Sequence, residues 1–153
     1  MPVMERTAKT VWQGNLMQGN GTVSVGSNAF GPLPVTFAAR TERADGKTSP
    51  EELIAAAHAT CFAMAFSSNL AKAGKPPEEL TVSATCTLDR REGHLSITKM
   101  QLDVKARVPG IDKAEFEQIA HEAGRSCPVS RALSGNVDIR VNAELEQTAG
   151  MPR

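Results

Sequence analysis

The sequence lacks an excess of either charge. Its 153 residues include 17 Lys and Arg against 17 Asp and Glu, which gives a formal net charge of zero at pH 7. A balanced chain has no general attraction to nucleic acid or to an anionic membrane. It also lacks a long basic stretch or a DNA-binding helix pair. We therefore expect no nucleic-acid partner.

The opening residues, Met-Pro-Val-Met-Glu-Arg, lack the apolar run of a signal peptide. The longest uncharged segment contains His58, Thr60 and Asn69, which disfavours a membrane span. Three cysteines without a secretory signal are typical of the reducing cytoplasm, where cysteine pairs tend to be catalytic or redox-sensing. We expect a cytoplasmic protein without membrane association.

Neither Cys-x-x-Cys nor His-x-x-x-His occurs, so a structural zinc site has little support and we expect no metal. Internal repeats and low-complexity linkers are absent as well. The length suits one domain with a sizeable core, and we expect residues 1–153 to form it.

Residues 48–74 form the dominant segment. Thr48 or Ser49 can cap a helix, Pro50 fits its first turn, and Gly74 can end it in a left-handed conformation. No residue from Leu53 to Phe66 is charged, apart from any charge that His58 carries. The helix is therefore apolar on every face. Such a helix is buried.

Two cysteines occupy contrasting positions, Cys61 in the middle of this helix and Cys127 before a proline that suits a helix start. Buried cysteines are usually inert core residues. Cys127, however, lies between Arg125 and Arg131, an environment that stabilises a thiolate. The two residues are therefore a candidate redox pair, with two inert thiols as the alternative.

His58 offers a different chemistry, because it lies three residues before Cys61 and one helical turn away. A Cys61–His58 dyad of the hydrolase kind is geometrically conceivable. A histidine hydrogen-bonded in the core is the simpler interpretation.

Around the helix, periodicity predicts an α+β fold. A charged loop, 40–47, precedes the helix, and Arg40 or Arg43 could fold back over its N-terminus. A bulge is expected near Lys99 and a capping box at Asp112 and Glu115. The predicted elements are an antiparallel meander of strands 5–12, 22–25 and 35–39, a hairpin of strands 80–88 and 94–108, a helix from 112 that Gly124 stops, a short helical turn through 133, a strand 137–145 and a frayed tail from 146 to 153.

Two segments, Thr48-Ser-Pro-Glu-Glu-Leu-Ile-Ala-Ala-Ala-His-Ala-Thr-Cys-Phe62 and Ser126-Cys-Pro-Val-Ser-Arg-Ala-Leu133, closely resemble the OsmC/Ohr family of thiol peroxidases. Trp12-Gln-Gly-Asn15, Gly21-Thr-Val-Ser24 and Val108-Pro-Gly-Ile-Asp112 resemble its OsmC branch, and the similarity spans essentially the whole chain. The resemblance implies an intertwined homodimer, in which antiparallel sheets wrap around paired central helices and the active sites lie at the subunit interface.

The resemblance also implies roles for individual residues. Cys61 matches the peroxidatic cysteine, and Cys127 matches the resolving cysteine. Arg40, at the end of the predicted third strand, matches the activating arginine, and Glu51 matches the glutamate that holds this arginine. Arg43 is a weaker candidate for the arginine. The implied reaction reduces an organic hydroperoxide to an alcohol through a Cys61 sulfenic acid and a Cys61–Cys127 disulfide. A dithiol, such as a lipoyl group, would reduce the disulfide, without metal, flavin or haem.

The apolar residues around the site should favour alkyl and lipid hydroperoxides; they are Phe62, Met64, Phe66 and either Phe30 or Phe37. Two rival functions are carried forward. One is a thiol hydrolase that uses Cys61 and His58, which would not need Cys127. The other is a non-catalytic dimeric protein whose apolar pocket binds a small ligand.

Overall fold

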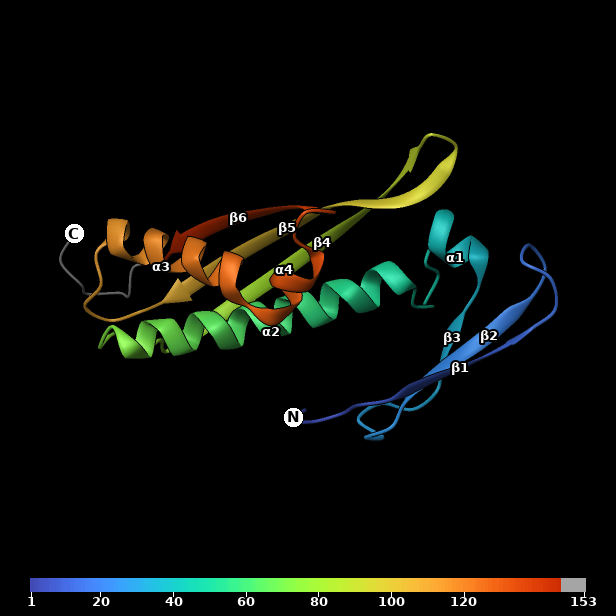
Figure 1. Ribbon diagram of the computed structural model, residues 1–153, viewed down its shortest axis with the longest axis horizontal. Coiled ribbons are helices and arrows are strands. Elements are labelled where there is room, and N and C mark those ends of the chain that lie inside the picture. The colour runs from blue at the N-terminus through green and yellow to red at the C-terminus, as the bar shows by residue number, and fades with distance from the viewer. Residues whose placement is uncertain (147–153) are drawn as a thin grey trace. The chain divides into compact units, whose positions relative to one another are not determined.

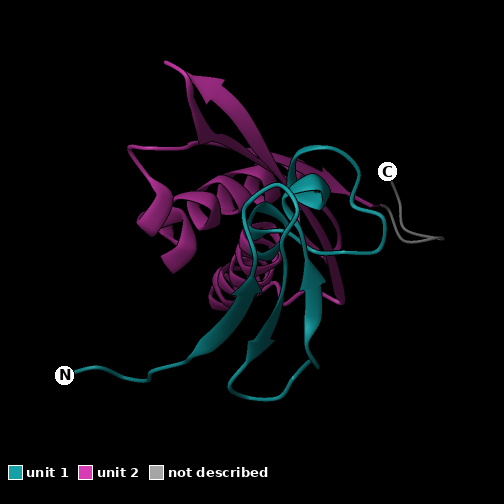
Figure 2. Ribbon diagram, turned by 90° about the vertical axis from the view of Figure 1, so that its right-hand side faces the viewer, with its two compact units in different colours: residues 1–53 teal, residues 54–153 magenta. Residues whose placement is uncertain are grey.

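The structure is a computed structural model that describes residues 1–146. It divides into two compact units, Met1–Leu53 and Ile54–Arg153, coloured teal and magenta in Figure 2. Each unit contains a three-stranded sheet.

The first unit is built on the predicted antiparallel meander. Its strands are β1 (Ala8–Gln13), β2 (Asn20–Val25) and β3 (Leu33–Val35), in that spatial order (Figure 1).

The predicted third strand, 35–39, is wrong in its second half. β3 ends at Val35, and a short helix, α1 (Phe37–Thr41), follows. Thr36 adopts an extended conformation, and its Oγ1 accepts a hydrogen bond from the Ala39 N–H at 3.1 Å, which is the geometry of an N-cap. Arg40 therefore lies in a helix and not at the end of a strand.

The long helix α2 (Pro50–Lys72) begins and ends where the sequence predicts. Ser49 Oγ accepts a hydrogen bond from the Glu52 N–H at 3.1 Å and so caps the start. Gly74 has a φ of +77°, and the Lys75 N–H donates to the Leu70 carbonyl at 2.9 Å. This is the left-handed termination that favours glycine.

Burial along α2 is less complete than its composition predicts. By length and composition this helix could span a membrane. Its buried residues, however, follow one stripe. In the second unit they are His58, Phe62, Phe66 and Leu70. Their spacing of four residues is that of one helix face packed on a core. Other faces are open, and Met64 is 68% exposed.

The second unit contains β4 (Glu79–Arg91), β5 (His94–Arg107) and β6 (Asp138–Leu145), in that order. β4 and β5 form the predicted hairpin. Thr87 pairs with Lys99 and Leu88 with Ile97, so Thr98 is the extra residue of the predicted bulge. The turn is tighter than expected, because Glu92 and Gly93, both with positive φ, form it alone.

This sheet is mixed, which corrects the expectation of purely antiparallel pairing. β6 runs parallel to β5, and the crossover contains α3 (Lys113–Ser126) and α4 (Pro128–Leu133). Parallel neighbours require such a connection because a tight turn cannot join them. Asp112 Oδ1 caps α3 by accepting from the Glu115 N–H at 2.8 Å, as predicted.

Gly124 does not stop α3, contrary to the prediction; the helix continues to Ser126. The glycine serves close packing instead. A Cβ at this position would lie 2.5 Å from Cγ2 of Val141 on β6, so the helix and the strand approach too closely for a larger residue.

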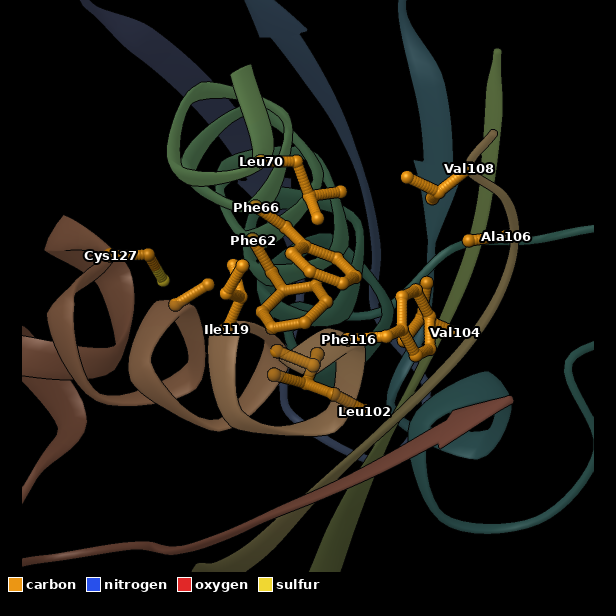
Figure 3. Packing of buried hydrophobic residues seen from close by; sticks show 12 residues of the cluster. Phe62, Phe66, Leu70, Leu102, Val104, Ala106, Val108, Phe116, Ile119 and Cys127 are labelled. Carbon is orange, nitrogen blue, oxygen red and sulfur yellow. The ribbon is translucent and has the colours of Figure 1, made fainter. Parts of the chain in front are cut away.

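The core of the second unit lies between α2, α3 and the sheet. In Figure 3, Phe62 and Phe66 of α2 extend toward Phe116 of α3. The ring centroids of Phe62 and Phe66 are 5.5 Å apart and those of Phe66 and Phe116 5.3 Å apart, both in tilted arrangements. Cys127 belongs to the same buried cluster.

Candidate functional site: two thiols, a buried histidine and an ion-paired arginine

The fold brings Cys61 and Cys127 together in the second unit. Cys61 is partly buried on α2, and Cys127 is fully buried at the junction of α3 and α4. In this structure the two cysteines are not joined by a disulfide.

The surroundings of Cys61 act in opposite directions on its pKa. Burial raises the pKa most, a hydrogen bond from the Val129 backbone lowers it, and the side chain of the adjacent Cys127 raises it. The net shift is upward. A reactive thiolate at Cys61 therefore needs a stabilising positive charge.

Cys127 is the N-cap of α4, with Pro128 in the first helical position. Its Sγ accepts a hydrogen bond from the Ser130 N–H at 3.4 Å and donates one to Ser130 Oγ at 3.0 Å. The helix start thus fixes the thiol and the hydroxyl against each other.

His58 is fully buried and contacts the same serine. Its Nε2 and Ser130 Oγ are 2.7 Å apart, whereas Nδ1 has no hydrogen-bond partner among residues 1–146. Burial lowers the pKa of His58, so the imidazole is neutral at neutral pH.

The Cys61–His58 dyad gains no support from this geometry. Within the part of the chain that the structure describes, His58 hydrogen-bonds Ser130 and not Cys61. Ser130 is not among the site residues predicted from the sequence. Its position three residues after a helix-capping cysteine could have indicated the contact with Cys127, but the contact with His58 joins residues 72 positions apart.

Arg40 and Glu51 form a bidentate ion pair within the first unit. Arg40 Nε donates to Glu51 Oε1 at 2.9 Å, and Nη2 donates to Oε2 at 2.9 Å. The hydrogen bond to Glu51 raises the pKa of Arg40 beyond its already high ordinary value. Arg43 lies in an exposed loop, without a hydrogen bond or ion pair among the described residues. The geometry favours Arg40 as the ordered cation.

A cavity of about 500 Å³ in the first unit adjoins the Arg40 side chain. Phe37, one of the two predicted phenylalanines, lines it, but Phe30 does not. Its wall is mostly apolar and includes Trp12, Leu16, Val23, Val35 and Leu53. The cavity thus combines a hydrocarbon wall with one fixed positive charge.

The four predicted site residues therefore form two pairs, Cys61 with Cys127 and Arg40 with Glu51, located in different units. Among the residues that the structure describes, no cluster of three or more His, Cys, Asp or Glu side chains could hold a metal ion.

Residues 43–142 match the family described as OsmC-like protein. The chain is 41% identical over 128 residues to peroxiredoxin OsmC of Escherichia coli K12, across 84% of this chain and 89% of that protein. It is 34% identical over 110 residues to organic hydroperoxide resistance protein-like 1 of Staphylococcus epidermidis, across 68% and 75%. The chain belongs to the OsmC family.

Solved structures support the same fold. The organic hydroperoxide resistance protein OsmC of Legionella pneumophila superposes with a TM-score of 0.73. The superposition covers 94% of this chain and 99% of that one at 23% identity. The α+β, OsmC-like fold that the sequence predicts is confirmed.

Proposed function

We propose that the protein reduces organic hydroperoxides to alcohols, with Cys61 as the peroxidatic and Cys127 as the resolving cysteine. Family membership makes the chain a cysteine-based peroxidase, since its relatives carry the names peroxiredoxin and organic hydroperoxide resistance protein. The observation that carries the residue assignment is the adjacency of the Cys61 and Cys127 side chains, which come from two segments distant in sequence.

In the first step, the Cys61 thiolate attacks the terminal oxygen of ROOH. The O–O bond breaks, RO⁻ leaves and takes up a proton to become ROH, and Cys61 becomes a sulfenic acid. Burial opposes thiolate formation, so we assign Arg40 as the cation that stabilises both the thiolate and the leaving oxygen. Glu51 holds the guanidinium in a fixed orientation.

In the second step, Cys127 attacks the Cys61 sulfur. The S–O bond breaks, an S–S bond forms, and the released hydroxide becomes water. A dithiol then reduces the disulfide, and lipoyl groups fit this chemistry because they deliver two thiols at once.

The apolar cavity beside Arg40 supports a substrate with a hydrocarbon group. Its wall can bury an alkyl chain that hydrogen peroxide lacks. We therefore expect alkyl and lipid hydroperoxides to react faster than hydrogen peroxide.

We further propose that the working form is a homodimer in which both units contribute to one OsmC-like domain. The face of α2 opposite its buried stripe is uncharged yet exposed; Ala57, Thr60, Met64, Ser68 and Ala71 lie on it. A second subunit would bury this face. Light scattering coupled to size exclusion should give twice the chain mass of 16.3 kDa, and a Met64→Glu variant should shift toward monomer.

The experiment that tests the proposed reaction titrates the reduced protein with cumene hydroperoxide and, separately, with hydrogen peroxide. Intact mass and peptide mapping follow each addition. We expect stoichiometric formation of a Cys61–Cys127 disulfide, faster with the organic peroxide. Thiols that stay free after excess cumene hydroperoxide would reject the peroxidase and favour a ligand-binding protein. A stable acyl-enzyme with an activated ester would favour the hydrolase.

A further inference from the structure

We infer that His58, acting through the Ser130 hydroxyl, accepts the proton of the Cys127 thiol when the disulfide forms. This inference rests on the proposed function and assigns two further residues to its second step. His58 and Ser130 would then take up the proton that disulfide formation must remove from Cys127, a thiol that bulk water does not reach.

The three side chains form a continuous hydrogen-bonded chain inside the second unit. Cys127 Sγ donates to Ser130 Oγ at 3.0 Å, and Ser130 Oγ lies 2.7 Å from His58 Nε2. His58 and Cys127 are completely buried, and Ser130 is 1% exposed. Because solvent does not reach the thiol, its proton needs a protein acceptor.

The donor and acceptor pattern sets the direction of transfer. Ser130 Oγ accepts from the thiol, so its own proton is available to Nε2 of a neutral His58. Burial keeps the imidazole neutral by lowering the pKa of His58, and only a neutral ring can accept. The proton on this ring is then on Nδ1, the nitrogen without a partner among the described residues.

The S–H proton of Cys127 passes to Ser130 Oγ while the Ser130 proton passes to His58 Nε2, which leaves a thiolate and an imidazolium. The thiolate attacks the Cys61 sulfenic sulfur, the S–S bond forms, and hydroxide leaves. The hydroxide takes a proton from Ser130 Oγ, and Ser130 is reprotonated by the imidazolium, so that His58 returns to its neutral form. The net change converts a sulfenic acid and a thiol into a disulfide and water.

A purely structural role explains the arrangement less well. A buried polar atom without a partner destabilises the fold, and an apolar side chain at position 58 would avoid that penalty. Other titratable side chains also lie close by. Cys61 adjoins Cys127, and His121, Arg125 and Asp138 line the same cavity as Ser130.

The test measures the two steps separately in a rapid-mixing experiment. Reduced protein meets one equivalent of cumene hydroperoxide, and acid quench with intact mass follows the sulfenic acid and the disulfide over time. The variants are His58→Gln, which can hydrogen-bond Ser130 but cannot take up a proton, and Ser130→Ala, which removes the link. His121→Gln is the matched control, since it changes a histidine on the same cavity outside the hydrogen-bonded chain.

We expect sulfenic acid to form in all four proteins, and disulfide closure to slow by about 10²-fold in His58→Gln and Ser130→Ala only. In the wild type and in His121→Gln, closure should also slow as pH falls through the pKa of His58, because an imidazolium cannot accept a proton. His58→Gln should lose this dependence, which a packing defect would not remove.

Closure at the wild-type rate in either variant, with sulfenic acid formed normally, would overturn the inference alone. Ser130→Ala keeps it testable if His58→Gln does not fold. Absence of sulfenic acid in the wild type would overturn the proposed function itself, and the inference with it.

Discussion

Arg40 and Glu51 are joined by three hydrogen bonds, in which Nε contacts both carboxylate oxygens at 2.9 and 3.1 Å and Nη2 contacts Oε2 at 2.9 Å. The Glu51 side chain is 10% exposed, so solvent competes little for it. Within residues 1–146, Nη1 of Arg40 has no acceptor. The pair therefore fixes the guanidinium while keeping one of its nitrogens available for another group.

Arg40→Ala should slow the oxidation of Cys61 by cumene hydroperoxide by about 10²- to 10³-fold, as expected when a charge-stabilising donor is removed. Without the cation, the pKa of Cys61, which burial already raises, should rise further. The pH dependence of Cys61 alkylation measures this shift, and Arg43→Ala serves as the matched control. An alkylation profile equal to that of the wild type would show that Arg40 does not act on Cys61.

Cys127→Ser should consume one equivalent of peroxide and then stop. Its Cys61 sulfenic acid has lost the proposed resolving thiol, so it should persist or oxidise further to sulfinic acid. Dimedone labelling and intact mass detect the two products. Undiminished multiple turnover with a dithiol reductant would argue against a resolving role for Cys127.

Gly124→Ala should destabilise the protein by about 1 kcal/mol, and by no more than about 2 kcal/mol. The added Cβ would lie 2.5 Å from Val141 Cγ2, an overpacking that costs about 1–3 kcal/mol. The higher helix propensity of alanine offsets about 1 kcal/mol of this cost. Urea unfolding measures the change. Val141→Ala in the same chain should recover part of the loss, whereas Gly31→Ala, with no neighbouring atom within 4 Å, should change little. Equal stability of the Gly124 and Gly31 variants would contradict the close contact.

Stability should fall as pH decreases below about 6.5, the ordinary pKa of histidine. Burial lowers the pKa of His58 in the folded chain, so in this range the unfolded chain binds the extra proton and unfolding is favoured. Above the ordinary pKa, both states are neutral at His58 and the effect vanishes. Urea unfolding between pH 5 and 7.5 should show a smaller decline in His58→Gln. The same decline in both proteins would mean that other groups cause it.

Local signals predicted most elements because their causes lie within a few residues. Ser49 and Gly74 bound α2, and Asp112 caps α3. Near Lys99 the apolar residues change from odd to even positions, which indicated the bulge. The Arg40–Glu51 pair followed from the family resemblance and from the need for a held cation.

The incorrect or missing predictions have long-range or competing physical causes. Val35-Thr-Phe-Ala-Ala alternates like a strand, but the Thr36 cap converts its second half to α1. Gly124 suits a helix end by residue type, yet its role depends on Val141, which only the parallel placement of β6 brings near. The contact of His58 with Ser130 likewise requires the folded chain, since no local pattern relates the two positions.

The capping position of Cys127 links the chemistry to local order in α4. Once Cys127 is joined to Cys61, its sulfur has no proton, and the hydrogen bond to Ser130 Oγ is lost. The first turn of a six-residue helix then loses part of its anchoring. Amide hydrogen exchange in residues 128–133 should therefore be faster in the oxidised protein. A reductant would encounter a looser α4 while the disulfide is present, and the segment would tighten again once both thiols are restored.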